Sequence, residues 1–379
     1  MCGIAGFVND MPIDVKCPVL QRMTDMIAHR GPDSEGHYID EHAALGHRRL
    51  SIIDLGGGQQ PIYNEDGSKV ITFNGEIYNY QTLREELIAA GHTFTTKSDT
   101  EVLLHGYEQW GVDLLQRVRG MFTFVIWDKN KQELFGARDH FGIKPFYYAK
   151  MNGTFMYASE IKSLLRHPDF VKELNAEALK PYMTFQYPAI GETFFKGVYK
   201  LPEGHYFTYR DGKMDIHRYY DEDFREGKQK LGELVNSIDQ TVCDSVKAHQ
   251  IADVEVGSFL SSGVDSSYVA AVARPQHTYS IGFGKGTYNE SQQAGELAEL
   301  LKLNNTAESL TDEEAFAAFP RIQWHLDEPD SNPSCVPLYF LSALAAKDVK
   351  VVLSGEGATS CSPDTSTTAC TPNSGPSRW

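Results

Sequence analysis

A cysteine stands directly after the initiator methionine, a position that can give a thiol its own base. If Met1 is removed, the α-amine of Cys2 has an ordinary pKa of about 7.7–8, so a fair fraction is neutral near pH 7. A neutral amine can take the proton of the adjacent thiol and leave a nucleophilic thiolate without a histidine partner. A cysteine at this position, taken alone, is more often a small buried thiol. The residues that follow it must decide between a nucleophile and a buried thiol.

Six short motifs follow Cys2 in order, and together they are more specific than any one alone. With Met1–Gly6 they resemble the class II glutamine amidotransferases, and among these the glutamine-hydrolysing asparagine synthetases. The resemblance extends from Met1 to Ala358. In the first half its motifs are His29–Asp33, His47–Asp54, Phe73–Asn79, Ser98–Glu101, Gly120–Phe122 and Arg138–Pro145.

The resemblance implies a glutamine-hydrolysing site with Cys2 as its nucleophile. Amide hydrolysis passes through a tetrahedral oxyanion, and the resemblance assigns its donors to the Asn74 amide and the Gly75 N–H. Arg49 suits the α-carboxylate of glutamine as a forked donor, and Asp99 suits its α-ammonium. The expected glutamine pocket consists of Arg49, Leu50, Ser51, Ile52, Ile53, Asn74, Gly75, Glu76 and Asp99.

Structural interpretations of the same residues stay open at this point. Asn74 and Gly75 are also typical of a turn, Asp99 of a helix-cap neighbour, and Arg49 of a surface ion pair. We assign no chemical step to the motifs that contain Arg30 and Arg138, which are equally compatible with a structural role.

A second candidate site lies at Val254–Ser267, where the pattern predicts a strand, a loop and a helix. Small residues after a strand let N–H groups approach an anion, and the helix N-terminus adds partial positive charge. The segment lacks the Walker pattern, and alone it is equally a capped helix start. It resembles the SGGxDS pyrophosphate loop of adenylating enzymes, with Ser262 at the first glycine. Serine does not freely adopt positive φ, which counts against full phosphate affinity.

Two downstream motifs, Ser280–Phe283 and Val349–Ala358, extend this resemblance. All three segments lie at the carboxyl ends of predicted strands, which is where open α/β sheets bind ligands. By resemblance, Asp265 contacts Mg²⁺ with the pyrophosphate, and Glu356 acts at a β-aspartyl-AMP intermediate. The expected ATP-binding residues are Leu260, Ser261, Ser262, Gly263, Asp265, Ser266, Ile281, Ser354 and Gly355.

The first half of the chain is predicted to be strand-rich, an α+β pattern. By resemblance it forms the αββα sandwich of the N-terminal-nucleophile hydrolases. The predicted strands are Ile4–Val8, Val70–Asn74, Phe122–Trp127, Glu133–Ala137, Phe146–Tyr148 and Thr154–Ala158. The predicted helices are Val19–Ala28, Tyr80–Ala90 and Asp99–Trp110, the last entered from Ser98.

From residue 231 strands and helices alternate, which is typical of a parallel sheet covered by helices. The predicted strands are Val254–Leu260, Thr278–Phe283, Thr306–Leu310 and Val349–Leu353. The predicted helices are Leu231–Ala248, Val336–Ala346 and three that begin near Asp265, Glu290 and Asp312.

These patterns predict a glutamine amidotransferase domain at residues 1–210, a linker at 211–230 and a partial ATP-pyrophosphatase domain at 231–358. Residues 359–379 contain no Leu, Ile, Val, Phe or Met, so they cannot bury enough apolar surface to order themselves. We expect them to be a disordered or frameshifted end. The family continues with an acidic pair where this chain has Thr359 and Ser360, so the resemblance implies an incomplete α/β domain.

Composition limits the choice of partners and compartment. The net charge of −16 argues against nucleic acid or an anionic membrane as the main partner. The N-terminus has no signal-peptide pattern, and no apolar stretch reaches the length of a membrane span. The six cysteines are too scattered for a zinc site or a disulfide scaffold. We expect a cytoplasmic protein, and a homo-oligomer is compatible with the sequence.

The resemblance implies transfer of the glutamine amide nitrogen to aspartate, driven by cleavage of ATP to AMP and pyrophosphate. The expected partners are therefore glutamine, aspartate and ATP, with Mg²⁺. We expect this chain to keep the glutaminase half and to carry a defective synthetase half. Two alternatives stay open: a related amide- or lactam-forming synthetase, and a non-catalytic subunit that associates with a full-length homologue.

Overall fold

The computed structural model describes residues 1–187, 189–223, 229–283, 291–330 and 332–357. It divides into two compact units. Unit 1 comprises Met1–Lys228 with Gln323–Asn332, and unit 2 comprises Gln229–Ile322 with Pro333–Trp379. The end predicted at residues 359–379 lies outside the described residues. Among those that are described, no helix is long and apolar enough to cross a membrane.

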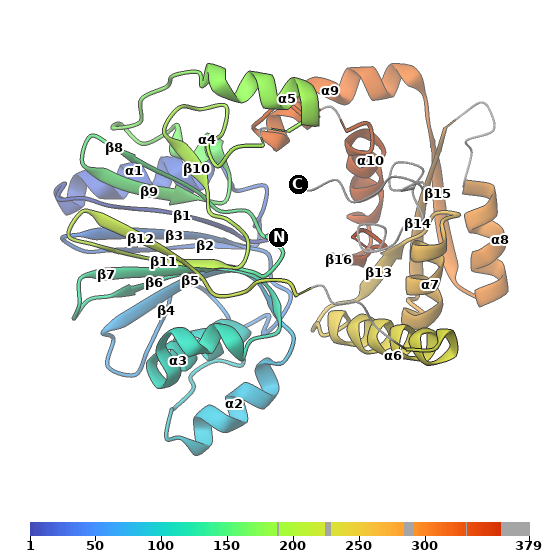
Figure 1. The fold of residues 1–379 in the computed structure, drawn as a ribbon, viewed down its shortest axis with the longest axis horizontal. Helices are drawn as coiled ribbons and strands as arrows, with labels where there is room; N and C mark the ends of the chain where they lie inside the picture. The colour runs from blue at the N-terminus through green and yellow to red at the C-terminus, as the bar shows by residue number, and fades with distance from the viewer. Residues whose placement is uncertain (188, 224–228, 284–290, 331, 358–379) are drawn as a thin grey trace. The chain divides into compact units, whose positions relative to one another are not determined.

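Unit 1 contains two six-stranded antiparallel sheets that lie face to face (Figure 1). The first sheet has the order β10-β8-β9-β1-β3-β2, and the second has the order β12-β11-β7-β6-β5-β4. The first consists of β1 (Gly3–Val8), β2 (Ser34–Ile39), β3 (Ala43–Arg49), β8 (Tyr147–Met151), β9 (Thr154–Ala158) and β10 (Val198–Lys200). The second consists of β4 (Ile62–Tyr63), β5 (Lys69–Ile77), β6 (Gly120–Asp128), β7 (Glu133–Arg138), β11 (His205–Arg210) and β12 (Lys213–Arg218).

Both faces of the central strands β1, β6 and β9 are buried, because helices cover the outer faces of the sheets. Side chains alternate between faces along a strand: Ile4 joins the core between the sheets, while Ala5 and Phe7 join the core on the outer face of the first sheet. Trp127 and Phe155 fill the space between the sheets. This double burial is why these central strands are nearly continuous apolar runs.

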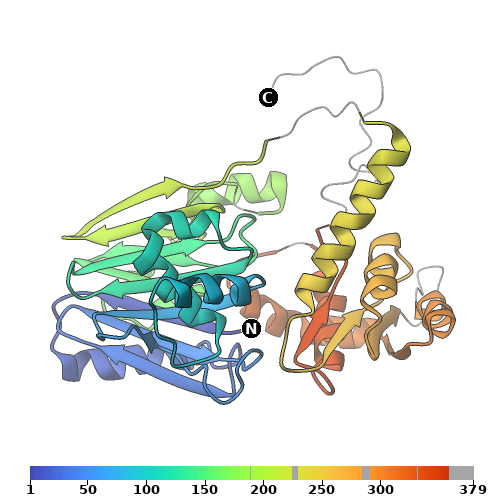
Figure 2. The same cartoon turned by 90° about the horizontal axis from the view of Figure 1, so that it is seen from below.

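The outer helices complete the αββα sandwich that the sequence predicted (Figures 1 and 2). α1 (Ile13–Asp25) and α4 (Ile161–Leu164) pack on the first sheet. α2 (Tyr80–Ala89), α3 (Asp99–Trp110) and the 3₁₀ helix Gly111–Gln116 pack on the second. The remaining helices of this unit are the 3₁₀ turn Ala176–Ala178 and α5 (Leu179–Phe185).

Several boundaries differ from the sequence-based prediction. α1 begins at Ile13, six residues earlier than predicted, and contains Pro18. Because proline lacks an N–H, the sequence alone favours a helix that begins after Pro18. Strand β3 contains His47, Arg48 and Arg49, which give no apolar alternation, and it was not predicted. Strand β12 pairs with β11 through Arg218, so the second sheet continues past residue 210 into the predicted linker.

Unit 2 contains a four-stranded parallel sheet in the order β15-β14-β13-β16, as the alternating pattern predicted. Its strands are β13 (Val256–Phe259), β14 (His277–Phe283), β15 (Asn304–Leu310) and β16 (Val351–Leu353). Its helices are α6 (Leu231–His249, yellow in Figure 2), α7 (Val264–Ala273), α8 (Ser291–Leu301), α9 (Asp312–Leu326) and α10 (Cys335–Ala345). α7 and α8 share one apolar cluster with Leu260, and α10 packs on Tyr279 in another.

The segment Gln323–Asn332 belongs to unit 1 although the chain around it belongs to unit 2. Asp327 accepts a hydrogen bond from the main-chain N–H of Ile161 at 2.6 Å and lies 2.9 Å from the Lys162 ammonium. Glu328 accepts from the N–H of Phe194 at 3.0 Å. These buried carboxylates hold the segment against the first sheet and its helix α4.

Candidate functional site

Cys2 lies at the start of β1, a strand with neighbours on both sides in the first sheet. Its carbonyl accepts a hydrogen bond from Nε of Arg30 at 2.9 Å. The N–H of Leu50 lies 3.4 Å from the sulfur. Burial raises the pKa of the Cys2 thiol above its usual range, and the main-chain hydrogen bond with Leu50 only partly opposes this. The thiol therefore needs a nearby base before it can react at neutral pH.

Arg30 is itself fixed by a buried carboxylate. Its Nη1 lies 3.0 Å from Oε1 of Glu160, and His29 Nε2 lies 3.0 Å from the same oxygen. Lys162 contacts the other oxygen of Glu160 at 2.5 Å. Burial alone would raise the pKa of Glu160, but hydrogen bonds and charges from His29, Arg30 and Lys162 outweigh it and lower the pKa to about 2. This network makes the N-terminal end of β1 rigid.

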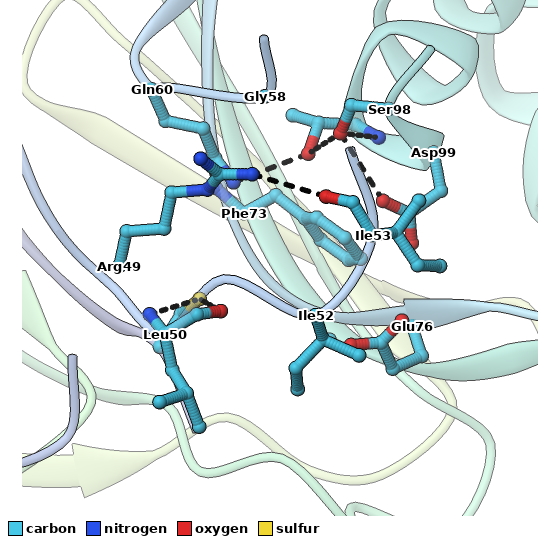
Figure 3. Close-up of a pocket in the computed structure, with 13 residues that line it drawn as sticks. Arg49, Leu50, Ile52, Ile53, Gly58, Gln60, Phe73, Glu76, Ser98 and Asp99 are labelled. Atoms are coloured by element: carbon cyan, nitrogen blue, oxygen red, sulfur yellow. Dashed lines mark hydrogen bonds between the residues drawn. The ribbon is translucent and has the colours of Figure 1, made fainter. Parts of the chain in front are cut away.

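A small cavity opens beside Cys2, and most of the predicted glutamine residues line it (Figure 3). The space that it offers to the centre of a water molecule is about 20 Å³, which is about that of one water molecule. The predicted residues that line it, besides Cys2, are Arg49, Leu50, Ile52, Ile53, Gly75, Glu76 and Asp99. The lining residues that sequence reasoning missed are Gly58, Gln60, Phe73, Ser98 and Thr100.

The main-chain N–H of Gly75 faces this cavity because of how β5 pairs. In an antiparallel strand the N–H groups of alternate residues point to the same side. The N–H of Phe73 donates to Oε1 of Gln60 at 2.7 Å, and the N–H of Ile77 donates to Oδ2 of Asp99 at 3.0 Å. Gly75 lies between them, so its N–H points the same way, away from β6 and towards the cavity.

Asn74 and Ser51 are the two predicted glutamine residues that are not in the cavity lining. Asn74 is buried on β5, and neither atom of its side-chain amide has a hydrogen-bond partner among the described residues. Leaving such a group unpaired costs about 1–3 kcal/mol, and a native structure retains it where a ligand or water completes it. Ser51 instead directs its N–H to a carboxylate oxygen of Asp33 at 2.9 Å.

Arg49 borders the cavity, but its guanidinium is engaged by the loop that follows. Nη2 donates to the carbonyls of Ile53 at 3.0 Å and Asp54 at 2.7 Å, and the first of these bonds is drawn in Figure 3. These two bonds occupy only Nη2, and Nη1 makes one long contact of 3.5 Å with the carbonyl of Leu55. A guanidinium has five N–H donors, so Arg49 keeps donors for a carboxylate.

Two acidic side chains share the opposite side of the cavity. Burial raises the pKa of Asp99 to about 6, although hydrogen bonds from Ile77 and Ser98 oppose the shift. Burial and the charge of Asp99 raise the pKa of Glu76 well above its usual range. A pKa of about 6 leaves Asp99 mostly ionised at pH 7, so its carboxylate is available to an ammonium group.

The chain's α-amine lies in the same environment. In this structure the amine belongs to Met1, and burial, with help from the charges of Arg30 and Lys144, lowers its pKa to about 5. Burial also lowers the pKa of Lys144 to about 8, and its Nζ lies 3.2 Å from the Met1 sulfur. Sequence reasoning gave Lys144 no role; its only signal was its place in the motif Arg138–Pro145.

In unit 2 the predicted pyrophosphate-loop residues come together at the carboxyl ends of β13 and β16. β14 and β15 follow β13 on one side, while β16 lies on its other side, so the chain changes direction there. Open α/β sheets bind ligands at such a switch point. A Cβ at Gly355 would lie 2.7 Å from the N of Ser266 and 3.0 Å from Asp265. The tight approach places the loop after β16 against the first turn of α7.

Hydroxyl groups organise this loop. Ser261 and Ser266 place their side-chain oxygens 2.7 Å apart, and Ser261 accepts from the N–H of Gly263 at 3.1 Å. Ser262 is not among the residues with positive φ, so serine costs no backbone strain there. Ile281 packs against the Tyr279 cluster, and the N–H of Glu356 lies 3.4 Å from Oγ of Ser354. Leu260 donates its N–H to the carbonyl of Tyr279 at 2.9 Å.

Comparison with known proteins gives matches along both halves. Residues 1–220 match the family described as a glutamine amidotransferase domain, and residues 237–360 match the family described as asparagine synthase. Glutamine-hydrolyzing asparagine synthetase 1 of Bacillus subtilis is 44% identical over 366 residues, 94% of this chain and 58% of the relative. A putative glutamine-hydrolyzing asparagine synthetase 2 of Methanocaldococcus jannaschii is 33% identical over 94% of this chain and 74% of its own length.

The chain thus spans less than two thirds of the Bacillus relative. Among solved structures, the glutamine phosphoribosylpyrophosphate amidotransferase of B. subtilis covers 81% of this chain and 65% of its own, with 15% identity and a TM-score of 0.44. That likeness is too weak to bear on function.

Replacing Glu160 should destabilise the protein in a pH-dependent way. The pKa of Glu160 is about 2 in the folded protein against an ordinary 4.5, so its stabilisation is fully present above pH 4.5 and is lost as the pH falls towards 2. We expect Glu160→Gln to lower the free energy of unfolding by about 3–5 kcal/mol at pH 7, because it leaves the buried Arg30 without its carboxylate partner. Urea unfolding at pH 7 and pH 3 should show the difference shrinking at the lower pH.

The matched control is Glu173→Gln, which breaks an exposed ion pair with Lys196. Surface pairs contribute little, so this variant should unfold like the wild type at both pH values. A Glu160→Gln protein as stable as the control would contradict the role of the Arg30–Glu160 pair.

Proposed function

The chain belongs to the family of glutamine-hydrolysing asparagine synthetases, and from this premise we propose that it hydrolyses glutamine at Cys2 to supply ammonia. In this proposal the ammonia amidates aspartate at the second site with ATP as the energy source. The observation that supports the first step most strongly is the convergence of Cys2, the Gly75 N–H, Arg49 and Asp99 on one cavity.

In the glutaminase step the free amine of Cys2, after loss of Met1, takes the thiol proton. An α-amine has an ordinary pKa of about 7.7–8, so a fair fraction of the Cys2 amine is neutral near pH 7 and can act as this base. The thiolate attacks the amide carbon, and the amine returns the proton to the departing ammonia. Water then hydrolyses the thioester and releases glutamate.

The negative charge of the tetrahedral intermediate needs donors that are already in place. The N–H of Gly75 points at the cavity, and the Asn74 amide is buried without a partner among the described residues. We assign these two groups to the oxyanion. Arg49 and Asp99 then take the α-carboxylate and the α-ammonium of glutamine, and Leu50, Ile52, Ile53 and Glu76 shape the pocket around its side chain.

At the second site, ATP is a substrate whose phosphates would bind at the N-terminus of α7. Gly263 is the N-cap of that helix, and Ser261 and Ser266 supply hydroxyl groups beside it. Mg²⁺ binds proteins through one or two carboxylates together with substrate phosphates. Asp265, in the first turn of α7, is suited to that role, and the bound metal would neutralise phosphate charge.

Glu356 follows Gly355 on the loop after β16, and we assign it to the activated aspartate. Ile281, Ser354 and Gly355 would contact the nucleotide. Free glutamine, aspartate and ATP are cytoplasmic metabolites, and the four described cysteines are all free, so we propose that the protein acts in the cytoplasm. A homo-oligomer and the absence of a nucleic-acid or membrane partner remain parts of the proposal.

The first test is covalent labelling of the nucleophile. We expect purified protein to release glutamate from glutamine, and a glutamine-analogue alkylator to add once, on an N-terminal Cys2 without Met1. Cys2→Ala should lose both the adduct and the activity. Mass analysis of the N-terminal peptide checks the site, with Cys17→Ala, which removes an exposed thiol, as the matched control. Active protein that retains Met1 would contradict the proposed base.

The second test addresses the oxyanion. We expect Asn74→Ala to lower kcat for glutamate release by about 10²–10³, the usual cost of losing one oxyanion donor, with a small change in KM. Steady-state kinetics measure both constants. Asn130→Ala, at an exposed turn, is the control and should behave like the wild type. A change confined to KM would assign Asn74 to ground-state binding instead.

The third test identifies the acceptor. We expect pyrophosphate release from ATP to require aspartate, and Asp265→Asn to reduce it about 100-fold through loss of metal binding. Asp312→Asn, on exposed α9, is the control. Pyrophosphate release without aspartate would favour a lactam-forming synthetase. A protein with neither activity that binds a full-length homologue would favour the non-catalytic subunit.

A further inference from the structure

Four side chains that glutamine hydrolysis does not use converge beside α3. Glu65 comes from the turn between β4 and β5, and His92 from the loop after α2. His105 and Glu108 lie three residues apart on α3, which puts them on one face of that helix. One ligand atom from each residue lies within 4.8 Å of all the others. All four belong to unit 1.

The spacing of these atoms fits a tetrahedral metal centre. Nδ1 of His105 lies 3.0 Å from Glu108 and 3.4 Å from Glu65, while Nδ1 of His92 lies 3.4 Å from Glu65 and 4.0 Å from Glu108. Ligands about 2.0–2.2 Å from a tetrahedral zinc ion are about 3.3–3.6 Å from one another. A metal ion placed among the four would therefore require only small side-chain shifts.

Acceptor groups lie beside the far nitrogen of both histidines, within hydrogen-bond distance for His92 and beyond it for His105. Nε2 of His92 lies 3.2 Å from the amide oxygen of Gln109, an acceptor, so the ring proton belongs on Nε2 and the Nδ1 lone pair is available. Nε2 of His105 lies 3.6 Å from the carboxylate of Glu101. Carboxylate or carbonyl partners on the far nitrogen are the usual surroundings of metal-binding histidines.

The carboxylates are held as well. The amide of Asn64 donates to Oε1 of Glu108 at 2.6 Å, and Lys69 approaches the same oxygen at 3.5 Å. The other oxygen, Oε2, is left facing the two histidines. Glu65 accepts the N–H of Thr93 at 3.1 Å. Each carboxylate is thus fixed by a contact outside the cluster before any metal arrives.

We propose that Glu65, His92, His105 and Glu108 bind one zinc ion. Two imidazoles with two carboxylates suit Zn²⁺, whereas Mg²⁺ prefers six oxygen ligands. Two carboxylates also balance the charge of a divalent ion. His105 is buried, while the Glu65 side chain is 39% exposed and offers a path for entry. Four protein ligands close the coordination sphere, which is typical of a structural site.

Such a site would join three segments around the glutamine pocket. His92 begins the loop that leads to Ser98 and Asp99, and His105 lies further along the helix that begins at Asp99. Zinc would therefore stabilise the segment that carries the proposed ammonium ligand. Zinc binding does not depend on glutamine hydrolysis, so either proposal can fail without the other.

The test is metal binding by full-length protein freed of metal with a chelator. We expect one equivalent of Zn²⁺ to bind by isothermal titration and to raise the thermal midpoint, while Mg²⁺ does neither. We expect His92→Ala and Glu65→Ala each to weaken zinc binding at least about tenfold. Both positions are partly exposed, and far-UV circular dichroism should show that the variants fold. The matched control, His42→Ala, removes a histidine that lies near Asp10 outside the cluster.

Cobalt substitution identifies the donor atoms. Co²⁺ bound by nitrogen and oxygen should give visible d–d bands without a thiolate charge-transfer band. Replacement of the cysteines should leave this spectrum unchanged. The absence of a stoichiometric zinc site would overturn the proposal and leave an ion-paired cluster around a protonated His105. Zinc binding that is unchanged in His92→Ala and Glu65→Ala, or that shows thiolate bands with cobalt, would overturn it equally.

Discussion

The hydrogen bond from Arg30 to the Cys2 carbonyl is the contact on which the glutamine site depends. Chain termini usually fray, yet this terminus must present a nucleophile in a fixed place. Arg30 is held by Glu160, and the N–H of Ile4 donates to Ser159 at 3.0 Å. Pairing of β1 with β3 and β9 holds the strand that follows Cys2 in place. The buried Arg30–Glu160 pair thus ties the N-terminus to residues more than 100 positions away, and the pocket forms around a preorganised thiol.

The second constraint is the early end of β4. This strand pairs with β5 only at Ile71 and Val70, so the N–H groups further along β5 need other partners. Gln60 and Asp99 accept two of them, and the one between, at Gly75, is aimed at the cavity. The part of β5 that β4 leaves unpaired therefore offers its main-chain N–H groups to side chains and to the cavity. The same side chains line the pocket, so sheet architecture and substrate recognition share residues.

Burial sets the electrostatics of this pocket. It lowers the pKa of the terminal amine and of Lys144 and raises the pKa of Asp99 and Glu76. All four shifts favour the neutral forms. Charges of like sign add to the shifts of the amine, Lys144 and Glu76, while charges of opposite sign oppose these three. The outcome is an amine that can accept a proton at neutral pH and one carboxylate, Asp99, that stays ionised. Neither property follows from a residue's type; each follows from how completely its neighbours exclude water.

The sequence by itself determined the architecture and most of the pocket, because apolar periodicity and short motifs are local. Alternation of strands and helices predicted the parallel sheet of unit 2. The resemblance of the short motifs to a known family implied the αββα sandwich and located Cys2, Arg49, Gly75 and Asp99. Tertiary structure alone decided which strands pair, so it alone could show where the Gly75 N–H points and that Gln60 lines the cavity. It also brought Asp327 to Lys162, and Glu65 to His105. These contacts join residues far apart in the chain, and a single sequence carries no pattern that specifies such pairs.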